Sequence, residues 1–209
     1  MTTTTATATK STETKSKPSR RLQILEALAL QLEQSPGERI TTAGLAKAVG
    51  VSEAALYRHF PSKAKMFEGL IEFIEDSIFG LITRILQEEK SSIARCEQMV
   101  KLLLTFAEKN AGMARLLTGE ALTGETERLR TRMSKFFERF ETQLKQVLRE
   151  GEMNTEIQLN ISVQASANMM LAFAEGHINQ YVRSSFKRSP LEYWGDHWYI
   201  VKGVISSSG

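Results

Sequence analysis

The stretch that decides the fold is VSEAALYRHFPSK, from Val51 to Lys63. Ser52 can begin a short helix, because a serine side chain at the N-cap accepts a hydrogen bond from a free N–H of the first turn. Leu56 and Phe60 lie four residues apart and form its apolar side. Pro61 disfavours the helical conformation for the residue before it, so the helix ends at Phe60. The opposite side of this two-turn helix then carries three large polar side chains: Tyr57, Arg58 and His59.

A second short helix is predicted just before this one. Thr41 or Thr42 can cap it, and Gly50 follows its last turn, where glycine is favoured. Two short helices joined by Gly50-Val51-Ser52 predict a helix-turn-helix unit. Its expected core positions hold the two helices at a fixed angle: Leu45, Val49, Val51, Leu56 and Phe60.

The exposed side of this unit suits the major groove of DNA, which admits an α-helix and displays readable base edges. Ala54 and Ala55 allow close approach and could contact a thymine methyl group. Glu53 and Arg58 are the candidates for base contacts, although Arg58 could instead bind a phosphate. The residues expected to contact phosphates are Tyr57, His59 and Lys63, with Thr41, Thr42 and Lys47 from the preceding helix. Ser52 completes this candidate DNA-binding set. The alternative is an ordinary solvated helix face.

The charge distribution supports a polyanion at this end of the chain. The net charge is +3, yet residues 1–21 carry +4, residues 22–38 carry −3, residues 39–65 carry +4 and residues 66–209 carry −2. A basic end on a slightly acidic body indicates that DNA is held at that end.

Almost everything after the first 18 residues has the pattern of helices, so the fold class is all-α. The Thr- and Lys-rich residues 1–18 lack large apolar side chains and are expected to form a disordered basic tail. The Ser35-Pro36-Gly37 turn is expected to end the first helix. Helices are predicted over residues 19–34, 62–87, 92–109, 113–117, 124–150, 157–186 and 191–205, the last with Pro190 at its start.

Several classes of protein are excluded by composition. No run of about 18 apolar residues could span a membrane, and the single cysteine, Cys96, cannot form an intrachain disulfide, so a cytoplasmic protein is expected. The three histidines are scattered without metal-ligand spacing, and no nucleotide-binding motif or catalytic constellation occurs. We therefore expect a protein that is not an enzyme and needs no metal, cofactor or small-molecule ligand.

The last helix carries a wide apolar stripe that needs a partner. Together with apolar positions of the preceding helix, it predicts a four-helix interface between two copies of the chain. The residues assigned to this homodimer interface are Met170, Ala174, Ile178, Trp194, Trp198 and Val201. The alternative is that the stripe packs within its own subunit.

The stretch ITTAGLAKAVGVSEAALYRHFPSKAKMFEGLIEFIEDS, residues 40–77, resembles the TetR family of bacterial DNA-binding regulators. This resemblance implies a helix-turn-helix DNA-binding domain of three helices over residues 19–66. It also implies a helical dimerisation and partner-binding body over residues 67–209. Two recognition helices of a dimer would face successive major grooves of palindromic double-stranded DNA.

Further segments narrow the resemblance to the nucleoid occlusion branch of that family: MFEGLIEFIEDS, LLTGEAL, QLKQVLRE and VRSSFK. Members of this branch are nucleoid-associated and, when bound to DNA, antagonise polymerisation of the division protein FtsZ. The resemblance implies that the FtsZ C-terminal tail binds a groove between the helices 62–87 and 92–109. The positions that match the branch there are Phe73, Leu102, Lys109 and Asn110.

Two features leave alternatives open. Thr105 and Leu81 replace the glycine and arginine of the branch, and EKNAGMARLL lacks its Asn-Pro-Gly-Leu turn, which puts the fit of the partner in question. The second hypothesis is a ligand-responsive transcriptional repressor of the TetR type. In that case Phe136, Phe137, Phe140 and the methionines at 169–170 could line a ligand pocket instead of forming core.

Overall fold

The structure is a computed structural model that describes residues 19–35 and 40–206. The predicted tail over residues 1–18 and most of the predicted Pro36-Gly37 turn lie outside these ranges. Within them the chain is helical, which confirms the all-α fold class, apart from one isolated antiparallel bridge between Leu159 and Ser206. The helices are α1 (Arg20–Gln34), α2 (Thr42–Val49), α3 (Glu53–His59), α4 (Lys63–Glu88), α5 (Ser92–Lys109), α6 (Ala111–Leu117), η1 (Glu120–Leu122), α7 (Glu127–Met153), α8 (Val163–Arg183) and α9 (Trp194–Ile205).

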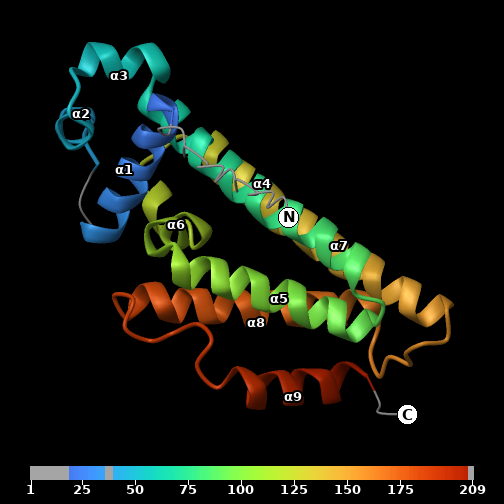
Figure 1. The fold of residues 1–209 in the computed structure, drawn as a ribbon. Helices are drawn as coiled ribbons and strands as arrows, with labels where there is room; N and C mark the ends of the chain where they lie inside the picture. Colours follow the sequence, from blue (N-terminus) through green and yellow to red (C-terminus); the bar gives the residue numbers. More distant parts are fainter. Residues whose placement is uncertain (1–18, 36–39, 207–209) are drawn as a thin grey trace, which may run out of the picture.

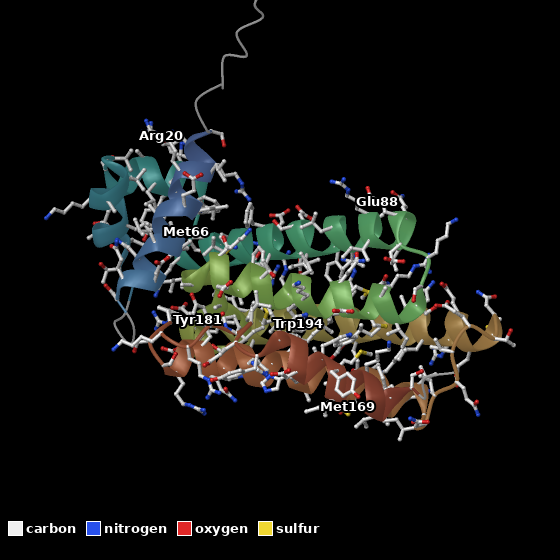
Figure 2. The ribbon with its side chains drawn as sticks, turned by 60° about the horizontal axis from the view of Figure 1, so that its bottom comes forward. Arg20, Met66, Glu88, Met169, Tyr181 and Trp194 are labelled. Carbon is white, nitrogen blue, oxygen red and sulfur yellow. The ribbon has the colours of Figure 1, made fainter. Side chains whose placement is uncertain are left out.

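Helices α1, α2 and α3 gather at one end of the molecule, and α4 leads from them into the body (Figure 1). Figure 2 shows Met66 near the start of α4, beside the three-helix end, and Glu88 at its far end. Serine and threonine side chains cap most of these elements. Ser52 Oγ accepts from the N–H of Ala55 at 3.1 Å, and Thr41 Oγ1 accepts from Gly44 at the same distance. Each cap satisfies an N–H that has no partner within its own helix, so the sequence determines where these short helices begin.

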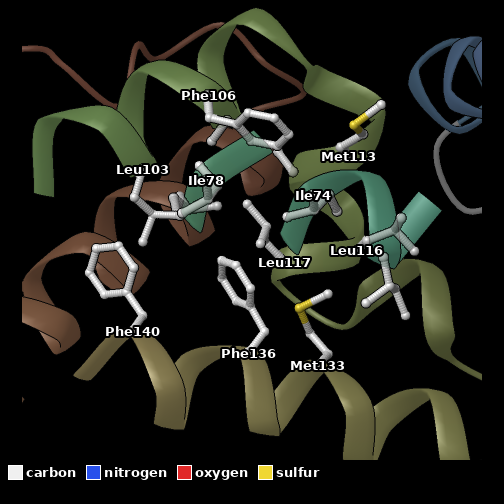
Figure 3. Packing of buried hydrophobic residues seen from close by; sticks show 14 of the residues in the cluster. Ile74, Ile78, Leu103, Phe106, Met113, Leu116, Leu117, Met133, Phe136 and Phe140 are labelled. Atoms are coloured by element: carbon white, nitrogen blue, oxygen red, sulfur yellow. The ribbon is translucent and has the colours of Figure 1, made fainter. Parts of the chain in front are cut away.

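The body is a layered set of helices in which α7 packs against α4, α5 and α8. Its core is filled by apolar side chains that approach one another from these helices, among them Ile78, Leu103, Phe136 and Phe140 (Figure 3). Phe136 packs in a tilted arrangement against Phe79 of α4, with an interplanar angle of 60° and ring centroids 5.5 Å apart. This packing makes the body a rigid support for the three-helix end.

Helix α6 joins that end to the body at very close range. A Cβ at Gly112 would lie 1.9 Å from the carbonyl oxygen of Ala29 in α1. One turn further, the guanidinium of Arg115 is only 3% exposed and donates to the carbonyl of Leu32 at 2.6 Å and to the Glu120 carboxylate at 2.9 Å. These contacts fix the orientation of α1 relative to the body.

Several helix boundaries differ from the sequence prediction, among them the end of α7 at Met153 instead of residue 150 and the end of α8 at Arg183 instead of residue 186. Helix α7 begins at Glu127, not at residue 124, and α8 begins at Val163 after a Ser162 cap, so residues 157–162 are not helical. Helix α9 begins at Trp194, and Pro190 lies in the preceding turn, not at the helix start. Backbone turns account for the end of α8 and the start of α9: Ser185 and Phe186 follow α8, Tyr193 precedes α9, and all three have positive φ, between 53° and 63°.

Most of the residues assigned to the homodimer interface lie inside the subunit. Met170, Ala174 and Ile178 face the interior of the subunit, where α8 packs against α5 and α7. Trp198 and Val201 of α9 are buried as well, and Trp194 is half-buried. Most of the apolar stripe of α9 therefore packs against its own subunit, and the half-buried Trp194 is the one assigned residue that keeps appreciable surface for a second copy.

In the part of the chain that the structure describes, every helix is too short or too polar to cross a membrane.

Candidate nucleic-acid interface

The α2–α3 unit is held from behind by buried side chains. Leu45 of α2, Leu56 of α3 and Phe60 after it are each no more than 1% exposed. Gly50 joins the helices with φ of 73°, a left-handed conformation that glycine adopts without strain. Val49 and Val51, also predicted as core, are only partly buried. The unit can therefore present one face of α3 in a fixed orientation.

That face is open to solvent. Glu53, Ala54, Arg58 and His59 are exposed, and the Tyr57 side chain is 41% exposed despite its size. Of the remaining candidate DNA contacts in this unit, the exposed ones are Thr41, Lys47 and Ser52, and the half-buried ones are Thr42 and Ala55. The structure thus brings the predicted DNA-binding residues of α2 and α3 onto one accessible end of the molecule.

One internal contact links the two helices across this face. The Thr42 hydroxyl donates to Glu53 Oε2 at 2.8 Å. Both residues are the first of their helices. The bond orients the Glu53 carboxylate, which leaves its other oxygen available for a donor such as a cytosine amino group.

Lys63 is placed differently from the other candidates. Its ammonium group donates to Glu125 Oε1 at 2.6 Å, and the two side chains are only 22% and 17% exposed. It also lies 5.5 Å from the centre of the Phe67 ring. The sequence could not show this contact, because the partner follows 62 residues later and no local spacing connects them.

Two basic residues that were not assigned a role in the sequence analysis flank the end of α3. The Arg21 guanidinium lies 4.4 Å from the centre of the Phe60 ring and 3.5 Å from the Glu72 carboxylate. Lys65 pairs with Glu68 at 2.7 Å and shares a shallow cleft with Arg21 and His59. Their only sequence signal is the excess of positive charge around residues 20–21 and 63–65.

The residues assigned to the partner tail meet in a cleft of about 420 Å³. Phe73, Lys109 and Asn110 line it, and Phe73 is 39% exposed, which is high for a phenylalanine. Helix α5 contributes only its last residue, Lys109, and the opposite wall is α1, which contributes Ala29 and the half-exposed Leu30. Leu102 is half-buried on α5 and is not part of the lining. Three of the four predicted residues are therefore together, on a cleft that the three-helix end helps to form.

A second exposed surface lies on α8 and α9. The α9 side chains that face away from the subunit are large and apolar: Tyr199 is 80% exposed, Ile200 60% and Val204 46%. Ala172 and Gly176 are exposed on α8. The Nδ1 of His197 and the Nε1 of Trp198 are buried without a hydrogen-bond partner.

The contact between α8 and α9 contains a pair of histidines. The rings of His177 and His197 lie 5.1 Å apart, beside Phe173. Burial lowers the pKa of His177, and His197 and Arg188 lower it further, although Glu192 and the Pro190 carbonyl act in the opposite direction. A histidine whose folded-state pKa lies below its unfolded value stabilises the fold above about pH 6.5 and loses that contribution as the pH falls.

We therefore expect the free energy of unfolding to decrease as the pH is lowered through about 6.5, by at most about 1.4 kcal/mol per pH unit from this group. Chemical denaturation between about pH 8 and pH 5.5 measures it. His177→Phe keeps an aromatic ring next to Phe173 and should flatten this dependence. Parallel pH profiles for the two proteins would show that His177 does not contribute.

The residues proposed for a ligand pocket take part in core packing instead. Phe136 and Phe140 are at most 1% exposed, and Phe137 packs edge-on against Phe136 at 5.1 Å between centroids. Met170 is fully buried. Among the described residues, no three histidine, cysteine or acidic side chains come close enough together to hold a metal ion.

Comparisons with known protein families agree with this arrangement. Residues 24–70 match the family described as "Bacterial regulatory proteins, tetR family", and residues 90–205 match the "SlmA-like_C: Tetracyclin repressor-like, C-terminal domain". The chain is 60% identical over 185 residues to the nucleoid occlusion factor SlmA of Marinomonas sp. (strain MWYL1), covering 88% of this chain and 94% of that protein. It is 56% identical over 189 residues to the SlmA of Alteromonas mediterranea, covering 90% and 97%.

Solved structures with the same fold are more distant in sequence. A TetR transcription regulator from Haloarcula marismortui aligns with a TM-score of 0.76 at 16% identity, covering 90% of this chain and 98% of that one. The regulator FadR from Bacillus subtilis, in complex with stearoyl-CoA, aligns with a TM-score of 0.72 at 16% identity, covering 88% and 98%. At this identity the likeness establishes the fold alone.

Proposed function

This chain belongs to the SlmA family of nucleoid occlusion factors within the TetR family of DNA-binding regulators, and from that premise we propose that it binds palindromic double-stranded DNA as a homodimer and, while bound, antagonises FtsZ polymerisation. The protein would then act in the cytoplasm on the nucleoid and prevent a septum from forming over the chromosome. The ligand-responsive repressor is not favoured, because the aromatic residues it would use are core.

The observation that carries the DNA-binding part is the exposed face of α3. A seven-residue helix anchored by Leu56 and Phe60 presents Tyr57, Arg58 and His59 outward. Aromatic and basic side chains without a packing role, on a helix that can enter the major groove, match what DNA recognition requires. We assign residues 19–66 to DNA binding and residues 67–209 to dimerisation and partner binding.

For the homodimer we propose the exposed faces of α8 and α9, in place of the buried residues first assigned. Small residues on α8, Ala172 and Gly176, allow two helices to approach closely. Tyr199, Ile200 and Val204 supply apolar area that a second copy of the chain would cover. A two-fold axis through this surface places one α3 on each side of the dimer.

The cleft between α1, α4 and α6 is the proposed site for the FtsZ C-terminal tail. Phe73, Leu30 and Met113 offer apolar contacts for an anchor residue, and Lys109 offers a positive charge at the rim for an acidic one. Because Ala29 and Leu30 belong to α1, a change in the position of the DNA-binding end would alter this cleft.

FtsZ assembly tests the proposal directly. Light scattering or sedimentation of FtsZ with GTP should show less polymer when both this protein and a duplex that it binds are present. Phe73→Ala should lose most of this effect while retaining DNA binding, and Met153→Ala, which truncates an 82% exposed side chain at the end of α7, should not. Unchanged polymer at saturating protein and DNA would contradict the proposed function.

Tyr57→Ala is expected to weaken binding to all duplexes similarly, because Tyr57 is assigned to a phosphate. Loss of a Lys or Arg side chain that neutralises one phosphate reduces the slope of log Kd against log salt by about 0.9. Tyrosine is neutral, so its loss should leave that slope nearly unchanged.

Arg58→Ala distinguishes the two roles proposed for Arg58. If Arg58 contacts a guanine, the variant should lose about 1–3 kcal/mol of binding free energy on the preferred sequence only. Fluorescence anisotropy at several salt concentrations measures both variants. A Tyr57→Ala variant that changed base preference alone would refute the phosphate assignment.

A further inference from the structure

Lys63 occupies a position where DNA and the protein body can compete for the same charge. It is the first residue of α4, directly after the Ser62 cap and four residues beyond the end of α3 at His59. A duplex seated against α3 brings its phosphate backbone to the groups that flank that helix. The Lys63 ammonium is instead held 2.6 Å from Glu125.

The partner carboxylate comes from a distant segment of the body. Glu125 lies between η1 and α7, and its own N–H donates to the carbonyl of Leu122 at 3.1 Å. The pair lines a cleft of about 490 Å³ that separates the end of α1 and Ile40 from this segment. Glu125 therefore reaches across the junction between the DNA-binding end and the body.

A second carboxylate of the same segment holds the other side of the junction. Glu120 of η1 accepts from two nitrogens of Arg115, at 3.1 Å and 2.9 Å. Arg115 in turn donates to the carbonyls of Leu32 and Ser35 at the end of α1. Residues 120–125 are thus linked to the DNA-binding end in two ways: directly by the Lys63–Glu125 ion pair, and indirectly through Arg115, which binds Glu120 and the carbonyls at the end of α1.

An ammonium group binds a carboxylate or a phosphate oxygen by the same kind of charge-assisted hydrogen bond. We propose that Glu125 is an internal substitute for a DNA phosphate: it holds Lys63 in the DNA-free protein, and a bound duplex takes Lys63 from it and releases residues 123–126. The Arg115–Glu120 link stays in place, so the change is confined to the segment that leads into α7. This inference rests on the proposed DNA-binding function.

The coupling between the ion pair and DNA acts in both directions: if bound DNA breaks the Lys63–Glu125 pair, loss of that pair must strengthen DNA binding. Removing the carboxylate removes the competitor, so Glu125→Gln should bind duplex DNA more tightly than the wild-type chain. Ion pairs of this kind contribute up to about 1 kcal/mol, which corresponds to a gain in affinity of about two- to fivefold. In a Lys63→Ala background the Glu125 substitution should have no effect on affinity, because the competition is then absent.

Glu127→Gln is the matched control, since it removes the same charge two residues away, where Glu127 pairs with Arg130 on the surface. Anisotropy titrations with a random-sequence duplex of about three helical turns measure the wild type, the three single variants and the double variant at one salt concentration. An equal gain for Glu127→Gln would reduce the effect to net charge and overturn the inference.

Amide hydrogen exchange provides the second readout. In the wild-type chain, DNA should accelerate exchange of the Thr123 and Glu125 amides, which donate to Glu120 and Leu122. In Glu125→Gln these amides should exchange rapidly with or without DNA. If the wild type binds the duplex while its exchange in residues 123–126 stays unchanged, the inference is wrong and the proposed function stands. If the wild type does not bind duplex DNA, the proposed function itself fails.

Discussion

Phe60→Ala should destabilise the protein by about 3–5 kcal/mol, the range for truncating a fully buried phenylalanine. The ring is 1% exposed, its edge would lie 3.1 Å from a Cβ at Gly69 in α4, and the Arg21 guanidinium covers its face at 4.4 Å. No neighbouring side chain can fill the space without moving α3 relative to α1 and α4. Urea denaturation followed by circular dichroism measures the loss.

Tyr57→Ala is the matched control for that prediction. It removes an aromatic ring from the same short helix, but from its exposed side, so the free energy of unfolding should change by no more than about 0.5 kcal/mol. The two variants should separate cleanly: Phe60→Ala loses stability, and Tyr57→Ala loses DNA affinity in a folded protein. Equal destabilisation by both would mean that Tyr57 has a packing role and that the exposed face of α3 is misassigned.

Gly112→Ala should cost about 3 kcal/mol, at the upper end of the range for overpacking. The added methyl group would lie 1.9 Å from the Ala29 carbonyl oxygen, 2.9 Å from the Ala29 carbonyl carbon and 3.1 Å from the Glu33 nitrogen. All three are backbone atoms of α1, so α1 and α6 must separate, which also strains the Arg115 contact with Leu32. Thermal unfolding is the measurement.

Gly80→Ala provides the comparison for Gly112→Ala. Gly80 lies in the middle of α4 with nothing within 4 Å of its would-be Cβ, so alanine there should stabilise the helix by up to about 1 kcal/mol. The FtsZ response should weaken only in Gly112→Ala, because that glycine and Ala29 both line the proposed tail cleft. A Gly112→Ala protein with unchanged stability would contradict the tight α1–α6 junction.

The helix-turn-helix could be predicted from the sequence because its determinants are local. The caps at Thr41, Ser52 and Ser62 each bond an N–H three residues later, and Gly50 has the positive φ that ends α2. These signals lie within a few residues of the boundaries that they set. The beginnings and ends of α2, α3 and α4 accordingly agree with the prediction to within about one residue.

The start of α9 could not be predicted, because residues other than glycine adopt left-handed conformations before it. Tyr193 has φ of 59° at the N-cap position, where its sequence neighbours give no turn signal. Pro190 is compatible with a helix start, but it is buried in the turn instead. The local sequence pattern correctly predicted a helix near the C-terminal end, but it placed the first residue at 191, three positions before Trp194.

Periodicity also identified the apolar stripe of α9 but not its partner. The same spacing of Trp194, Trp198 and Val201 fits a second subunit or the same one, and only the tertiary structure places Trp198 and Val201 against their own body. The pairing of Lys63 with Glu125 was hidden for a related reason, since contacts between distant segments leave no periodic signal. The candidate site was therefore predictable where it depends on α2 and α3, and not where it depends on the body.

The central claim is that two copies of the exposed α3 face lie in successive major grooves of one duplex. Protection of guanine N7 from methylation tests it most directly, because this atom lies in the major groove. On a palindromic duplex selected by the protein from random sequence, we expect two protected patches about 10 base pairs apart. Both patches should disappear with Arg58→Ala if Arg58 contacts guanine, and both should weaken with Tyr57→Ala. Tight binding that leaves every major-groove guanine reactive would contradict the account.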